Sequence, residues 1–146
     1  MPTQRTADPK RLIAFQGAHG AYSDVACRAA FPRMITLPCN TFEDAFQAVQ
    51  SGGALLGMIP VDNSVAGRVA DVHRLMPRSG LHIIGEHYER VNHHLLAPRG
   101  ATLRTVRTVL SHIHALPQCS KFIRQRGLKP VVYPDTAGAA AEVARR

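Results

Sequence analysis

LIAFQGAHGAYS, residues 12–23, is the stretch that decides the fold. Its first four residues, Leu12 to Phe15, are apolar and predict a short buried strand. Small residues follow at 17–20 and predict a turn. A helix is then expected from about Tyr22 to Ala30. It should end there because Pro32 restricts the backbone of the residue before it. The stretch therefore predicts a strand, a turn and a helix in succession.

The same alternation continues from this stretch toward the C-terminus. Further strands are expected at residues 35–38, 55–61, 106–110 and 130–134, the last of them buried. Helices are expected at residues 42–50, from within 62–68 to about 75, at 116–125 and at 137–146. Thr41 followed by Asp44 predicts an acidic variant of the capping box, and Asp135 with Thr136 predicts the last helix start. Alternating elements of this kind predict an α/β fold with mainly parallel sheets.

Residues 81–97 are expected to cross from one lobe to another, with an additional strand rising in the new lobe. The predicted organisation is a flexible N-terminus at 1–10, a first lobe at 11–85 and a second lobe at 86–146. The final Ala-rich helix is followed by no returning strand, so we expect a second lobe that is truncated before the chain returns to the first.

Composition excludes several classes of protein. Of 146 residues, 45% are hydrophobic and 19% charged, which is typical of a globular chain. The apolar runs are too short to cross a bilayer, and no signal-like stretch occurs in residues 1–10, so we expect a cytoplasmic protein without a membrane partner. The three cysteines have no metal-ligand spacing, which favours packing roles in a reducing compartment.

The net charge of +8 leaves three explanations open. The charge could bind nucleic acid. However, the arginines are scattered, Trp is absent and only 5% of residues are aromatic, so we expect no nucleic-acid partner. It could steer small anions to a site. It could also belong to one part of a longer protein whose remainder is acidic.

Four turns rich in small polar residues follow predicted strands, at 17–23, 62–67, 111–118 and 135–138. The carboxyl ends of parallel strands share one edge, and helix N-termini there offer unpaired N–H groups to anions. For each turn taken alone, an ordinary helix cap is the better explanation. Together they predict a cleft that binds a small anion.

Four blocks of sequence carry a resemblance to a known family. They are residues 13–23 (IAFQGAHGAYS), 57–69 (GMIPVDNSVAGRV), 111–119 (SHIHALPQC) and 135–140 (DTAGAA). In this order they resemble the motifs of prephenate dehydratases, over nearly the whole chain from Leu12.

The resemblance implies a two-lobed fold similar to type II periplasmic binding proteins, with the active site between the lobes. It implies that prephenate, a dicarboxylate, loses CO2 and water to give phenylpyruvate in phenylalanine biosynthesis, with no metal or organic cofactor. The substrate-binding residues that it implies are Asn63, Ser64, Gly67, Ser111, His112, Gln118, Thr136 and Ala137.

Each implied residue also has a structural explanation. Asn63 could be a turn residue, Ser111 and Thr136 could be caps, and Gln118 could face solvent. His114 stands where the family carries Gln, so we interpret it as drift. The adjacent pair His93-His94 lies on an extended segment and does not predict a metal site.

The family's Thr-Arg-Phe motif, which carries its proposed proton donor, does not occur in residues 1–146, and neither does the family's regulatory ACT domain. We therefore expect a fragment with weak binding, little turnover and no certain catalytic residue. An incomplete lobe would expose apolar surface, so we also expect copies of the chain to associate. The alternative is a non-catalytic module on the same fold that binds a small anion or an amino acid.

Overall fold

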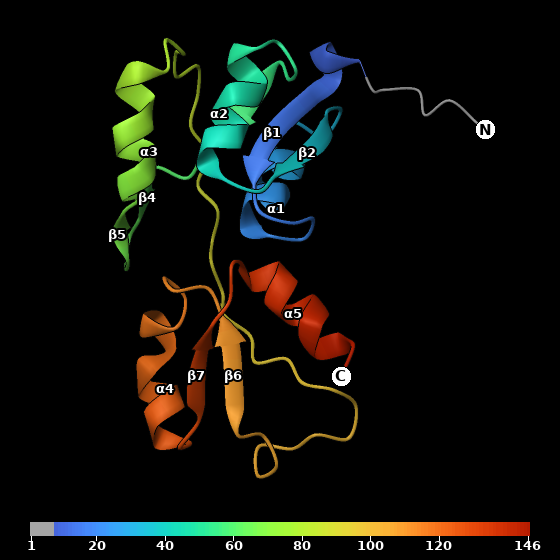
Figure 1. Ribbon diagram of the computed structural model, residues 1–146, viewed down its shortest axis with the longest axis vertical. Helices are drawn as coiled ribbons and strands as arrows, with labels where there is room; N and C mark the ends of the chain where they lie inside the picture. Colours follow the sequence, from blue (N-terminus) through green and yellow to red (C-terminus); the bar gives the residue numbers. More distant parts are fainter. Residues whose placement is uncertain (1–7) are drawn as a thin grey trace, which may run out of the picture. The chain divides into compact units, whose positions relative to one another are not determined.

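The computed structural model describes residues 8–146 and divides the chain into two compact units. The first unit consists of residues 1–63 and 67–89, and the second of residues 64–66 and 90–146. Each unit has its own sheet and helices (Figure 1). The architecture is mixed α/β with parallel sheets, as predicted.

The first unit is built on a three-stranded parallel sheet of order β2-β1-β3. Its elements are a 3-10 turn at Pro9–Arg11, β1 at Leu12–Gln16, α1 at Tyr22–Ala30, β2 at Ile35–Cys39, α2 at Phe42–Gln50, β3 at Leu56–Met58, β4 at Asp62–Asn63, β5 at Gly67–Arg68, α3 at Ala70–Leu75 and a 3-10 turn at Met76–Arg78.

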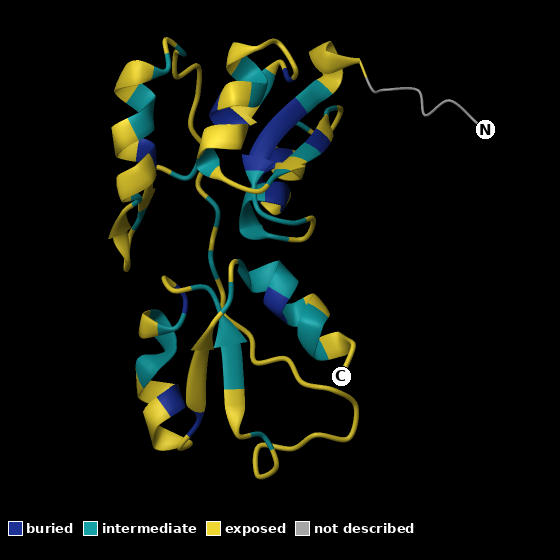
Figure 2. Cartoon of the chain, in the orientation of Figure 1, coloured by how far each residue is buried: buried dark blue, intermediate teal, exposed yellow. Residues whose placement is uncertain are grey.

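Strand β1 is buried on both faces because α1 packs on one face of this sheet and α2 on the other (Figure 2). Ile13 and Phe15 face one side and form a core with Cys27 of α1. Ala14 faces the other side and packs with Ala45 of α2 and with residues near β3. Alternate residues of a strand point to opposite faces, so one apolar run of four residues supplies both cores.

The helix starts of the first unit differ in their caps. The predicted capping box of α2 is confirmed: the Thr41 hydroxyl accepts from the Asp44 N–H at 3.0 Å, and the Asp44 carboxylate accepts from the Thr41 N–H at 3.1 Å. Helix α1 begins at Tyr22 as predicted, but no side chain caps it.

The prediction that a helix begins within residues 62–68 is wrong. The chain forms a short antiparallel hairpin there, with Asp62 opposite Arg68 and Asn63 opposite Gly67, and α3 begins only at Ala70. Gly67 has φ +80°, a conformation that favours glycine and lets the chain reverse. The expected strand at 55–61 is also shorter, because only Leu56 to Met58 pair with β1.

The second unit contains a two-stranded parallel sheet and two helices. Its elements are β6 at Thr108–Ser111, a 3-10 turn at Pro117–Cys119, α4 at Ser120–Gln125, β7 at Lys129–Val132 and α5 at Thr136–Ala144. Its buried apolar residues are Ala115, Ile123, Leu128 and Ala139. This core is thinner than that of the first unit, as the burial colours show (Figure 2).

Two predictions for the second unit are wrong. The strand at 130–134 was expected to be buried, but β7 is exposed at all four positions, because α5 packs mainly against the neighbouring strand β6. The backbone N–H groups of Lys129 and Tyr133 donate to carbonyls on the β6 side of the strand. Alternate residues point their N–H groups to opposite edges, so Pro130, which has no N–H, lies on the unpaired edge. The strand expected within residues 81–97 does not form.

Among residues 8–146, no helix is long and apolar enough to span a bilayer. All three cysteines are free thiols, and Cys27 is fully buried in the core of the first unit. Burial raises the pKa of the Cys27 thiol to about 12, as does the nearby Asp24 charge. The expected packing role therefore holds for Cys27.

Candidate functional site

The turn between β1 and α1 is the best-defined part of the candidate site in the first unit. Gly17 and Gly20 have φ of +117° and +87°, so two left-handed residues fold the chain tightly after the strand. The Gly17 N–H donates to the carbonyl of Cys39 at 2.9 Å, which ties the turn to the end of β2. The Gly20 N–H donates to the Asp24 carboxylate at 2.9 Å. The turn is thus held from both ends.

Asp24 is a charged residue that sequence reasoning did not single out. It is 2% exposed, and its Oδ2 accepts from the Gly20 N–H and from Arg28 Nε at 3.1 Å. Burial alone would raise the pKa of this carboxyl, but the Gly20 N–H, the Thr36 hydroxyl and Arg28 together outweigh it and lower the pKa to about 2. Asp24 is therefore ionised in the folded protein. The sequence signal that could have identified Asp24 is its spacing of four residues from both Gly20 and Arg28.

The hairpin carries three residues that the resemblance implies. Asn63 is half-buried in β4, and Gly67 is exposed in β5. Ser64 is exposed at the tip, which belongs to the second unit with Val65 and Ala66. The three residues therefore lie on one reversal of the chain rather than at a helix start.

In the second unit, the ends of the two parallel strands bring two of the predicted blocks together. Ser111 at the end of β6 lies opposite Val132 at the end of β7, and its carbonyl accepts from the Tyr133 N–H at 2.8 Å. The blocks at 111–119 and 135–138 therefore begin at the same edge of the sheet.

His112 and His114 form a pair directly after β6. Their ring centroids are 5.2 Å apart, and the His114 N–H donates to His112 Nδ1 at 3.3 Å. Burial lowers the pKa of His112, as does the neighbouring His114, while Asp135 opposes both. Because Nδ1 accepts a hydrogen bond, neutral His112 carries its proton on Nε2.

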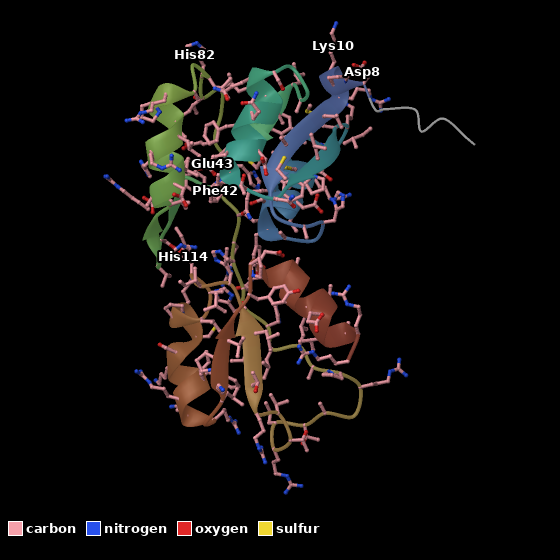
Figure 3. The ribbon with its side chains drawn as sticks, viewed as in Figure 1. Asp8, Lys10, Phe42, Glu43, His82 and His114 are labelled. Carbon is pink, nitrogen blue, oxygen red and sulfur yellow. The ribbon has the colours of Figure 1, made fainter. Side chains whose placement is uncertain are left out.

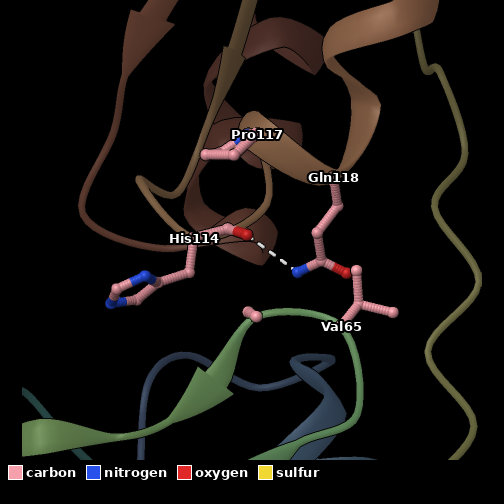
Figure 4. Close-up of a pocket in the computed structure, with 5 residues that line it drawn as sticks. Val65, His114, Pro117 and Gln118 are labelled. Atoms are coloured by element: carbon pink, nitrogen blue, oxygen red, sulfur yellow. Dashed lines mark hydrogen bonds between the residues drawn. The ribbon is translucent and has the colours of Figure 1, made fainter.

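Gln118 does not simply face solvent, since both ends of its amide are held. Its Nε2 donates to the carbonyl of His114 at 2.7 Å (Figure 4), and its Oε1 lies 3.2 Å from His93 Nε2. His114, labelled in Figure 3, was interpreted from sequence as drift, yet its backbone orients this amide. His93 was considered only as a metal ligand, and nothing in the sequence indicated its contact 25 residues away.

A cavity of about 310 Å³ adjoins this amide in the second unit. It is lined by Val65, Ala66, His114, Pro117 and Gln118 (Figure 4). Its volume is at the lower end of the range for small-molecule sites. Of the predicted residues, it contains Gln118 but not Ser111, His112, Thr136 or Ala137.

Asp135, rather than Thr136, caps α5. Its carboxylate accepts from the Gly138 N–H at 2.6 Å. A side chain at Gly138 would come within 2.7 Å of Asp135 Oδ2, so the cap requires a glycine there. Thr136 and Ala137 are half-buried in the first turn. Their N–H groups point toward the helix start, as anion binding would require.

Of the four predicted strand-to-helix turns, two are confirmed, at α1 and α5. The segment after β3 forms the hairpin, and the segment after β6 forms turns and a 3-10 turn before α4. Among the described residues, no group of three or more His, Cys, Asp or Glu side chains could hold a metal ion.

Comparison with known proteins gives consistent matches over most of the chain. The sequence pattern of the family described as prephenate dehydratase matches residues 13–146. The chain is 52% identical, over 92% of its length, to a bifunctional N-acyl-homoserine lactone acylase/prephenate dehydratase of Komagataeibacter europaeus. It is 39% identical, over 97% of its length, to the chloroplastic arogenate dehydratase/prephenate dehydratase 2 of Arabidopsis thaliana. It spans 48% and 38% of these two relatives.

Two solved structures share the fold. One, GqqA, described as a novel type of quorum-quenching acylase, superposes with a TM-score of 0.77 at 52% identity and covers 91% of this chain and 49% of that one. The other is a prephenate dehydratase from Arthrobacter aurescens in complex with L-Phe, with a TM-score of 0.70 at 22% identity, covering 90% and 45%. From the match over residues 13–146 and these relatives, the chain belongs to the prephenate dehydratase family.

Proposed function

We propose that this chain forms part of a prephenate dehydratase, a lyase that converts prephenate into phenylpyruvate, CO2 and water. The product is an aromatic ring, so aromatisation itself drives the loss of the carboxylate and the hydroxyl. The work left to the protein is to orient two carboxylates and to protonate the departing hydroxyl. Neither task requires a metal or an organic cofactor.

The observation that carries the proposal is the gathering of two motif blocks at one edge of the second unit. Parallel pairing of β6 with β7 brings Ser111, His112 and the first turn of α5 to the same strand ends. Gln118 is oriented nearby by His114 and His93. Hydroxyl, amide and backbone N–H donors of this kind suit a carboxylate.

Charge supports an anionic substrate. The second unit has ten Arg and Lys residues against two acidic residues, while the first has eight of each, so the whole net charge of +8 belongs to the second unit. A positive field of this kind raises the rate at which small anions arrive.

Within this proposal, the two units correspond to two lobes similar to those of type II periplasmic binding proteins, with lobe limits near residues 11–85 and 86–146. Prephenate would be bound by Asn63, Ser64 and Gly67 from the hairpin and by Ser111, His112, Gln118, Thr136 and Ala137 from the second lobe. A cytoplasmic location, the association of copies and the lack of nucleic-acid partners remain predictions.

The proposal includes low turnover by these 146 residues alone. The second unit has only two strands, and β7 is exposed throughout, so the groups at its edge are held by a thin core. Loosely held groups orient a substrate poorly, and small misplacements are costly in rate.

The test is an assay of phenylpyruvate formation from prephenate. Arogenate is assayed separately, because several relatives are named arogenate dehydratases and its amino group makes phenylalanine the expected product. Calorimetric titration measures binding separately. Gln118→Ala should weaken prephenate binding by roughly tenfold, the loss of one hydrogen bond to a charged group. Gln125→Ala, the same substitution on an exposed residue of α4, is the matched control.

Binding without turnover, even at high protein concentration, would favour the alternative of a non-catalytic anion-binding module. The absence of binding to both substrates would refute the proposal.

One observation favours a second candidate activity. The 52% identical relative is named for an N-acyl-homoserine lactone acylase as well as for the dehydratase. Hydrolysis of such an amide would release a fatty acid and a homoserine lactone. Chromatographic detection of both products would support it, and their absence under conditions where prephenate is consumed would exclude it.

A further inference from the structure

The buried carboxylate of Asp24 has one oxygen that lacks a hydrogen-bond partner. Its Oδ2 is occupied by the Gly20 N–H and by Arg28, but Oδ1 accepts no hydrogen bond among the described residues. A buried acceptor without a partner destabilises the folded state, and more so when it is charged. A group that can donate to Oδ1 is therefore expected close by.

His19 is that group. Its Nδ1 lies 3.6 Å from Asp24 Oδ1 and 3.4 Å from the Thr36 hydroxyl oxygen. Arg28 also donates from Nη2 to this hydroxyl oxygen at 3.3 Å. A proton on Nδ1 would face the carboxylate and the hydroxyl, whereas a lone pair there would face the unpaired carboxylate oxygen and repel it.

The other ring nitrogen of His19 is left for a ligand. The side chain is 57% exposed, and no hydrogen bond to Nε2 occurs within residues 8–146. The ring is tilted against Phe15, with centroids 6.1 Å apart, so it is supported by the last part of β1. His19 belongs to the turn at the carboxyl end of the central strand, where ligands bind in parallel sheets.

We propose that Asp24 fixes a proton on His19 Nδ1 and thereby makes Nε2 the atom that exchanges a proton with a ligand at the end of β1. Asp24 is then a positioning residue, and His19 is the group that meets the ligand. Thr36 and Arg28 hold the carboxylate and the imidazole in one arrangement.

This inference rests on the proposed function for its chemical role. When the ring carboxylate of prephenate leaves as CO2, its bonding electron pair enters the ring and expels the hydroxyl. Residues 1–146 do not contain the Thr-Arg-Phe motif that carries the family's proposed proton donor, and within them imidazolium Nε2–H gives its proton to that hydroxyl. The hydroxyl departs as water, and His19 is left neutral with its proton on Nδ1. Solvent returns the proton to Nε2. The charged groups facing the imidazole are Asp24 and Arg28, both from α1.

The position of the proton is tested first, without any assay of activity. Nitrogen-15 NMR of histidine-labelled protein distinguishes the two neutral tautomers at alkaline pH. The expected result is Nδ1–H for His19 in the unaltered chain, and a shift of the population toward Nε2–H in Asp24→Asn. A dominant Nε2–H tautomer of His19 in the unaltered chain would overturn the inference, whether or not the variant folds.

The catalytic role is tested with two substitutions of the same residue. The Asn amide in His19→Asn can replace Nδ1 beside Asp24, and the Gln amide in His19→Gln reaches toward the position of Nε2, but neither transfers a proton. Both should lower kcat for prephenate by roughly a hundredfold or more with a smaller change in KM, and both should remove the decline of kcat toward alkaline pH.

His82→Gln, on another exposed histidine of the first unit, is the control. Full kcat in His19→Asn would show that the imidazole is only structural and would overturn the catalytic role. If the unaltered chain consumes no prephenate while NMR finds the Nδ1–H tautomer, the proposed function fails and the arrangement of Asp24 and His19 stands.

Discussion

Both units are built from parallel strands followed by helices, but they differ in how far the strands are buried and in net charge. In the first unit, β1 has a strand on each side and a core on each face. In the second unit, β7 has one neighbour and is exposed along its whole length. The first unit is electrically balanced, and the second carries the entire excess of positive charge.

The difference shows that sharing a motif pattern does not give equal stability. A strand with a helix packed on each face buries both sets of alternating side chains, so a few residues contribute a large part of the hydrophobic free energy. A two-stranded sheet buries less, and uncompensated positive charge adds repulsion. We therefore expect the first unit to hold its structure more firmly than the second.

The largest loss of stability is expected from a substitution in the core of the first unit. Phe15→Ala removes a side chain with no exposed surface and should lower the free energy of unfolding by about 3–5 kcal/mol. Phe122→Ala makes the same change in the second unit, where the side chain is 38% exposed and its ring contacts Arg126. It should cost about 1 kcal/mol. Urea unfolding followed by circular dichroism measures both, and equal losses would contradict the comparison.

The next effect concerns the buried charge, which among the described residues occurs only in the first unit. The folded pKa of Asp24 is about 2 against an ordinary 3.8, so its stabilisation is complete above 3.8 and is lost as pH falls toward 2. The shift corresponds to roughly 2 kcal/mol. Asp24→Asn should therefore be less stable at neutral pH and lose less on acidification.

Urea midpoints at neutral and acidic pH test this prediction, with Asp71→Asn in the exposed part of α3 as control. If Asp24→Asn and the unaltered chain lose the same stability on acidification, Asp24 is not the source of the acid sensitivity.

A smaller effect compares one helix cap from each unit. Thr41→Ala and Asp135→Ala each remove a side chain that accepts an N–H at a helix start, at a cost of about 1 kcal/mol. Hydrogen exchange should show faster opening of α2 in the first variant and of α5 in the second. Because the second unit is less firmly packed, α5 should approach full exchange sooner; slower exchange in α5 than in α2 would argue against that ranking.

The smallest effect is expected at the surface. Arg74 Nη2 lies 2.6 Å from Glu43 Oε1, which joins α3 to α2; Glu43 is labelled in Figure 3. Both side chains are more than half exposed, and water and salt screen exposed pairs so strongly that they contribute little to stability. Arg74→Met should therefore hardly move the thermal midpoint, and a loss as large as that of Phe15→Ala would show that the pair matters more than its exposure suggests.

Elements with strong local signals were predicted well from sequence. The apolar run at 12–15, the capping box of Thr41 and Asp44, and the glycines that end helices fix local structure through neighbouring residues. The hairpin at 62–68 was missed because its few polar residues fit a helix start equally well. The strand at 130–134 was placed correctly, but its burial was predicted wrongly. Burial depends on which elements pack against the strand, and the residues of the strand itself do not indicate this.

The candidate site divides in the same way. The motif blocks and the family followed from the order of residues along the chain. The contacts of Asp24 with His19 and Thr36, and of Gln118 with His93, join residues 5, 12 and 25 positions apart, and no local pattern predicts such pairs. The sequence determined which residues could do chemistry, because side-chain type and spacing are local. Only the tertiary structure decided which atom of each faces a partner, because that depends on how distant segments pack.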